Sequence, residues 1–148
     1  MNADGEAEVT IETDLVLLGP GSSGPAAGGF TASGAIVDRG KSCGEYRFAG
    51  PDDPEAGEPR AVTSTEVLEG RDGTLALQLV GVYGALVDGR MQGSGHWVVT
   101  RGTRAYEGVQ GTGTWTAESD FRRTLEGNGS PVAHATYVGT VHVAKAAA

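Results

Sequence analysis

Residues 93–115 read GSGHWVVTRGTRAYEGVQGTGTW and place six glycines beside both tryptophans of the chain. Glycine weakens ordinary strands and helices because it loses the most conformational freedom on folding. Within a strand it is typical of a bulge, a sharp bend or a close approach of other atoms. Trp115 shares one face of its predicted strand with Gly111 and Gly113, and such alternation of small and large residues fits the tapering interior of a β-barrel.

The composition of the whole chain supports an all-β fold. Glycine accounts for 25 of the 148 residues, against an average of about 7%. The glycines follow no Gly-X-Y period, which excludes collagen, and they alternate with β-branched and aromatic residues, which argues against a disordered linker. Runs of this kind, separated by turn formers, indicate one domain with many short strands.

Alternation of apolar and polar residues predicts eight strands. They span residues 9–18, 29–38, 43–49, 61–69, 74–84, 94–101, 111–118 and 132–144. Turn formers predict loops over 19–28 and 50–60, and Asp-Gly pairs predict tight turns at 72–73 and 88–89. The stretch 120–131 fits either a strand extension or one helical turn. We expect one domain over 9–144, with a flexible N-terminal tail over 1–8 and a short C-terminal tail over 145–148.

Eight strands joined by short connections fit two architectures. One is a single eight-stranded antiparallel closed β-barrel, whose interior holds side chains or one small ligand. The other is a two-sheet sandwich. The glycines favour the barrel, because its strands must bend sharply to close.

Charge and motifs restrict the function. The net charge is −8 and no basic cluster stands out, so we expect no nucleic acid partner and no membrane partner. We find no membrane-length apolar run and no export signal, and the expected location is cytoplasmic. Cys43 is the only cysteine, and no phosphate loop, zinc motif or serine-hydrolase motif is present, so we expect no cofactor and no metal.

The opening stretch resembles a signature of the allene oxide cyclase and dirigent superfamily of β-barrels. The matching residues are Gly102, Thr103, Ala105, Tyr106, Gly108, Gly111 and Gly113. The resemblance is strong over about 25 residues and weaker in the flanking EGRDGTLALQL and in the final strand. Arg104 replaces the second glycine of the motif. A left-handed backbone is strained at arginine, so either this turn is helical or a small penalty is tolerated.

The resemblance implies an eight-stranded barrel with an apolar cavity. Members of the superfamily include plant allene oxide cyclases, which close an unsaturated epoxide to a cyclopentenone, dirigent proteins, and small bacterial barrels that close rings in natural product biosynthesis. The expected function is therefore cofactor-independent cyclisation or isomerisation of a hydrophobic small molecule. The alternatives are a barrel that binds a lipid or metabolite without catalysis, and a structural module. Members also form homodimers or homotrimers through outer barrel faces, for which Val98 and Val138 are candidates.

The candidate substrate-binding residues are apolar positions on strands that the signature contains or adjoins: Trp97, Trp115, Val99, Leu77 and Leu79. They form either the barrel core or the wall of a cavity that folds a flexible substrate, since buried aromatic residues first of all contribute packing area.

The candidate catalytic residues are polar side chains on otherwise apolar faces: Tyr83, Tyr137 and Glu66. A buried polar group needs a partner or a chemical role. A phenol can donate a hydrogen bond to a carbonyl or epoxide oxygen, or to a backbone carbonyl with no catalytic role. Glu66 is either a buried carboxyl group or solvent exposed. Tyr106 is expected to close one end of the barrel.

Overall fold

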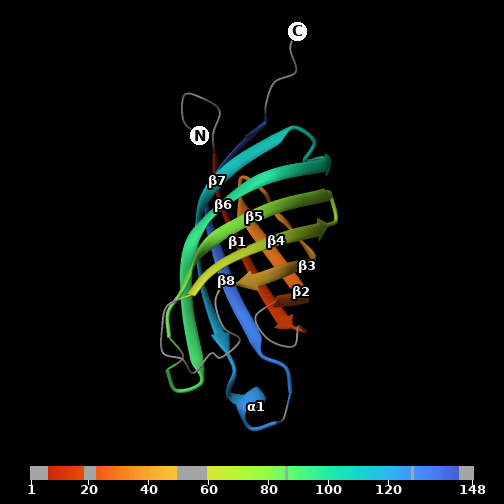
Figure 1. Cartoon of the computed structure of the whole chain (residues 1–148). Helices are drawn as coiled ribbons and strands as arrows, with labels where there is room; N and C mark the ends of the chain where they lie inside the picture. Colours follow the sequence, from red (N-terminus) through yellow and green to blue (C-terminus); the bar gives the residue numbers. More distant parts are fainter. Residues whose placement is uncertain (1–6, 19–22, 50–59, 86, 128, 144–148) are drawn as a thin grey trace.

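The chain forms a closed, eight-stranded antiparallel barrel (Figure 1), in a computed structural model that describes residues 7–18, 23–49, 60–85, 87–127 and 129–143. The elements are β1 (Ala7–Leu17), β2 (Ser23–Gly34), β3 (Asp38–Phe48), β4 (Arg60–Gly70), β5 (Gly73–Tyr83), β6 (Arg90–Arg104), β7 (Val109–Asp120), α1 (Arg122–Leu125) and β8 (Val132–Val143). Each strand pairs with the next in sequence, and β1 pairs with β8. This closure confirms the predicted barrel and excludes the sandwich.

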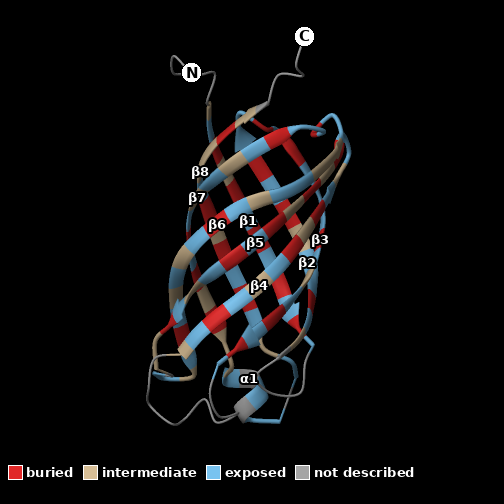
Figure 2. Cartoon of the chain, turned by 45° about the horizontal axis from the view of Figure 1, so that its top comes forward, coloured by how far each residue is buried: buried red, intermediate tan, exposed pale blue. Residues whose placement is uncertain are grey.

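Side chains alternate between the interior and the outer surface along every strand (Figure 2). On β1, for example, Val9, Ile11 and Leu15 are buried, whereas Glu12 and Asp14 are exposed. One continuous core fills the barrel and receives residues from every strand. The predicted outward positions of Val98 and Val138 are confirmed, with 44% and 47% of each side chain exposed.

The second and third strands differ from the prediction. Residues 23–28, which we expected in a loop, belong to β2, and residues 35–37, which we expected within a strand, join β2 to β3. Gly28 explains the first difference, because an added Cβ would stand only 1.8 Å from the carbonyl oxygen of Asp14 on β1. Gly34 has a φ of 91°, a left-handed conformation that ends β2 and favours glycine.

The two ends of the barrel are built differently. The first, here called the turn end, carries the connections 35–37, 71–72 and 105–108. The other, here called the α1 end, carries the single helical turn α1 (Figure 1) and the turn at Asp88 and Gly89, whose φ values are 51° and 77°. The Asp88–Gly89 turn is therefore confirmed. The other hairpin turn is tight, as predicted, but it is centred on Arg71 and Asp72, with Gly73 already in β5. The ambiguous stretch 120–131 contains a helical turn. Residues 50–59 of the predicted loop 50–60 and the tail segments 1–6 and 145–148 lie outside the described residues, while Arg60 belongs to β4 and Ala7 and Glu8 belong to β1.

A buried carboxylate organises the turn end. Asp38 accepts hydrogen bonds from the backbone N–H groups of Arg39, Arg71 and Asp72 at 2.8, 2.9 and 3.1 Å, and from the Tyr106 hydroxyl. Burial raises the pKa of Asp38, but these four bonds prevail and lower it to about 2. The structure thus confirms that Tyr106 closes one end of the barrel, and adds that Asp38 holds it there.

Arg104 adopts the left-handed backbone that the signature glycine would favour, with a φ of 56°. The turn therefore tolerates a penalty of roughly 1–2 kcal/mol. The exposed side chain crosses the turn end and donates a hydrogen bond from Nη2 to the carbonyl oxygen of Arg71 at 3.0 Å. This bond offsets part of the strain.

Candidate functional site

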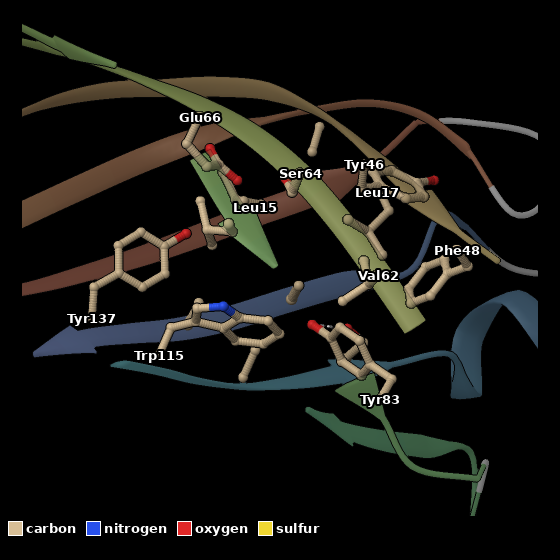
Figure 3. Close-up of a pocket in the computed structure, with 16 residues that line it drawn as sticks. Leu15, Leu17, Tyr46, Phe48, Val62, Ser64, Glu66, Tyr83, Trp115 and Tyr137 are labelled. Carbon is tan, nitrogen blue, oxygen red and sulfur yellow. Dashed lines mark hydrogen bonds between the residues drawn. The ribbon is translucent and has the colours of Figure 1, made fainter. Parts of the chain in front are cut away.

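An apolar cavity occupies the half of the barrel interior nearer the α1 end (Figure 3). Its walls are mostly aliphatic and aromatic, and its lining residues include Leu15, Leu17, Ala26, Phe48, Val62, Leu79, Trp115, Ala117, Ala133 and Ala135. The centres of water-sized molecules can occupy about 60 Å³ of it. One water needs about 10–15 Å³ on this scale, so the cavity is small and suits a small molecule.

Glu66 provides the one carboxyl group among the described residues that line the cavity. Its side chain is 3% exposed and points inward from β4. Burial raises its pKa to about 7, although the Ser42 hydroxyl, which donates to Oε2 at 3.0 Å, acts in the opposite direction. The protonated and ionised forms are therefore both populated near neutral pH.

Tyr137 points its hydroxyl toward the Glu66 carboxyl group across the inner end of the cavity (Figure 3). Burial raises the pKa of this phenol, and the neighbouring charge of Glu66 raises it further, so that the phenol stays protonated and can donate a hydrogen bond. Behind it, the Thr13 side chain is completely buried. Its hydroxyl finds no hydrogen-bond partner of normal geometry among the described residues.

Aromatic rings line the part of the cavity closer to the α1 end. Tyr46, Phe48, Tyr83 and Trp115 form a chain of ring contacts, with centroids 5.8, 5.3 and 5.9 Å apart. The Tyr83 hydroxyl accepts a long hydrogen bond of 3.4 Å from Ser119, and burial raises the pKa of this phenol. These rings form the cavity wall between Glu66 and the α1 end.

The structure brings five of the eight predicted site residues to this cavity: Glu66, Tyr83, Tyr137, Trp115 and Leu79. The other three do not line it. Trp97 and Leu77 are buried in the half of the barrel nearer the turn end, and Val99 is partly buried against the core there. The register between β5 and β6 shifts beside Leu77, which marks a bulge there.

Several residues of the site were missed in the sequence. Tyr46 and Phe48 share a face of the predicted strand 43–49, and their alternation with charged residues could have indicated a buried position. Nothing in the sequence marked Ser42 and Thr13 as site residues, because small hydroxyl residues are common on both faces of strands. Only the barrel closure reveals that β1, β3, β4 and β8 place Thr13, Ser42, Glu66 and Tyr137 near one another.

Other candidate sites among the described residues have less structural support. His134 lies on the outer surface, with Nδ1 2.7 Å from Asp14 and Nε2 3.9 Å from Glu12. In the described part of the chain, no group of histidine, cysteine or acidic side chains is arranged to hold a metal ion. Within the same residues, no helix is long and apolar enough to cross a membrane.

Comparison of the chain with protein families, with curated proteins and with solved structures finds no significant match in any of the three.

Proposed function

We propose that the barrel binds a hydrophobic small molecule in the cavity and promotes its cyclisation or isomerisation without a cofactor. The observation that carries the proposal is the pair formed by Glu66 and Tyr137 at the inner end of an otherwise apolar cavity (Figure 3). The resemblance of residues 93–115 to the allene oxide cyclase and dirigent barrels supports the same class of function. Fold alone would not, because one barrel architecture serves many functions.

Glu66 has the properties of a general acid or base. Proton transfer is most efficient when the pKa of the catalytic group lies near the working pH. Burial brings the pKa of Glu66 to about 7, and a carboxyl group in such an apolar setting can both take up and return a proton. Tyr137 supplies a protonated phenol beside it, which can stabilise negative charge on a substrate oxygen.

The cavity contributes by restricting the shape of the substrate. A small apolar space holds a flexible chain in few conformations, and conformations close to the reacting geometry lower the barrier. In an isomerisation of an unsaturated ketone, the Glu66 carboxylate would remove a proton from the carbon between the carbonyl group and the double bond. Tyr137 would donate a hydrogen bond to the carbonyl oxygen, and Glu66 would return the proton two carbons further along.

The proposal can be tested with oct-4-en-2-one, a linear ketone whose double bond lies one carbon away from conjugation. Catalysis would convert it to oct-3-en-2-one, whose conjugated system absorbs more strongly in the ultraviolet. We expect the wild-type protein to accelerate this conversion, Glu66→Gln to abolish the acceleration, and Tyr137→Phe to reduce it. A matched control is Glu69→Gln, which removes an exposed carboxylate from the outer face of the same strand.

A second candidate is a binding protein without catalysis. It is favoured by the hydrogen bonds that the polar groups already make with one another, Ser42 with Glu66 and Ser119 with Tyr83. Saturable binding of the ketone with no conversion would support this candidate. Absence of binding in both calorimetry and thermal unfolding would contradict the two proposals together and leave a structural module.

A further inference from the structure

The cavity is asymmetric in charge. The described residues that line it include one carboxyl group and three phenols, from Glu66, Tyr46, Tyr83 and Tyr137, and none of them is lysine, arginine or histidine. A negative charge that enters this space therefore meets no positive side chain on the cavity wall. It also loses its hydration, which costs several kcal/mol for an unpaired ion.

Two polar groups, the Glu66 carboxyl group and the Tyr137 hydroxyl, lie at the inner end of the cavity, whereas the hydroxyls of Tyr46, Ser64, Tyr83 and Ser119 line the part nearer the α1 end. Along their strands, Glu66 and Tyr137 are the lining residues furthest from the α1 end, and the walls between them and that end are mostly apolar (Figure 3). Tyr137 offers a hydroxyl donor, and the protonated Glu66 carboxyl group offers another. The completely buried Thr13 hydroxyl lies beside Tyr137 and lowers the pKa of its phenol through a hydrogen-bonding interaction, against the larger effect of burial.

We infer that the ligand carries an uncharged oxygen group, such as a ketone, aldehyde, epoxide or alcohol, on a short apolar chain, and that this group lies at Glu66 and Tyr137. The inference rests on the proposed function and specifies its substrate class. A carboxylate in the same place would face Glu66 with no compensating cation, and like charges in a shared apolar site repel strongly. A neutral carbonyl oxygen would instead accept the hydrogen bond of Tyr137.

The size of the cavity restricts the ligand further. Space of about 60 Å³ for the centres of water-sized molecules leaves room for a small ligand with a short apolar chain, because one water already needs about 10–15 Å³. The aromatic side chains of Phe48, Tyr83 and Trp115 form the walls along which this chain would lie.

Three eight-carbon probes distinguish the ligand classes: 2-octanone, octanoate and octylamine. We would measure their dissociation constants at pH 7.5 by calorimetry, and their effect on the melting temperature of the full chain. We expect 2-octanone to bind at least about tenfold more tightly than octanoate, a difference of about 1.4 kcal/mol. Octanoate binding as tight as that of 2-octanone would overturn the inference while leaving the proposed function intact. Tightest binding of octylamine would also overturn it, in favour of a site for cations.

Two variants test where the oxygen group of the ligand binds. Tyr137→Phe removes the proposed donor, and we expect it to weaken 2-octanone binding at least about threefold, within the range of one neutral hydrogen bond. Tyr106→Phe removes a phenol hydroxyl from the turn end, outside the cavity, and should leave the affinity of the folded protein unchanged. Equal affinities of the two variants would contradict the inference. Failure of all three probes to bind would contradict both the inference and the proposed function.

Discussion

Trp97 of β6 packs its indole on Gly113, the residue paired with it on β7, so closely that Nε1 lies 2.7 Å from where a Cβ of residue 113 would stand. Trp115 of β7 packs on a glycine two strands away, because its ring lies 2.5 Å from where a Cβ of Gly81 on β5 would stand. Each indole N–H also donates to backbone carbonyls, that of Trp97 to Thr114 and Val138. The glycines therefore provide the space in which the tryptophans lie flat on the inner wall of the barrel.

Gly113→Ala is expected to lower the melting temperature by about 3–10 °C, which corresponds to an overpacking penalty of about 1–3 kcal/mol. The added Cβ would stand 2.0 Å from the carbonyl oxygen of Val138 and could not be accommodated by a side-chain rotation alone. Gly84→Ala is the matched control, because its Cβ would make an ordinary contact of 3.6 Å with Gln92. Equal melting temperatures of the two variants in a thermal unfolding experiment would contradict the packing described here.

Glu66→Gln should stabilise the protein above neutral pH. Burial raises the pKa of Glu66 from 4.5 to about 7, so the folded state binds this proton more tightly than the unfolded state. The wild type therefore loses stability as the pH rises from about 4.5 to about 7, at about 1.4 kcal/mol per unit. A glutamine keeps the shape but has no charge to bury, so its advantage should grow over this range and reach the order of 3 kcal/mol.

Urea unfolding of both proteins at pH 5, 6, 7 and 8 would measure this advantage. Glu69→Gln, which removes an exposed carboxylate from the same strand, is the control and should show little change with pH. A Glu66→Gln variant that is less stable than the wild type at pH 8 would mean that the fold needs the ionised carboxylate.

Tyr106→Phe should destabilise the turn end by about 1.5–3 kcal/mol at pH 7, the usual contribution of a hydrogen bond to a charged group. The hydrogen bonds of Asp38 lower its pKa from 3.8 to about 2. Their stabilisation is therefore present above about pH 3.8 and is lost as the pH falls through about 2. Removal of the Tyr106 hydroxyl should raise the pKa of Asp38 and move this loss to higher pH.

Denaturant unfolding at pH 7, 4 and 3 tests this expectation. Tyr83→Phe deletes the same atom from a tyrosine whose hydroxyl makes only a 3.4 Å bond to the neutral Ser119, and it should cost less than about 1 kcal/mol. A penalty for Tyr106→Phe no larger than that for Tyr83→Phe would contradict the role of Asp38 at the turn end.

The strands with clear alternation could be predicted from the sequence, whereas those whose geometry depends on a neighbour could not. In β5, Leu75, Leu77 and Leu79 are buried as their period of two indicates. In β2, the Gly- and Pro-rich start looked like a loop because local propensity does not register close contacts between strands. Gly28 is needed there by the carbonyl group of Asp14, a residue of another strand.

For the candidate site, too, some features could be predicted from the sequence and others could not. The apolar neighbours of Tyr137 on its own strand indicated an inward face, whereas the sequence left Glu66 either buried or exposed; both side chains are buried. The position of the cavity depends on how far each side chain lies along the barrel, which follows from the register of all eight strands. For this reason Trp97 could not be distinguished from Trp115, although only Trp115 lines the cavity.

The two tryptophans should consequently respond differently to a ligand. Trp115 lines the cavity, whereas Trp97 is 1% exposed and lies among packed side chains nearer the turn end. In Trp97→Phe, the remaining Trp115 should change its fluorescence on titration with 2-octanone; in Trp115→Phe, the remaining Trp97 should not. Circular dichroism would establish that both variants keep the strand content of the wild type, and calorimetry would establish ligand binding independently of fluorescence. A response of Trp97 equal to that of Trp115 would mean that the ligand occupies the opposite half of the barrel.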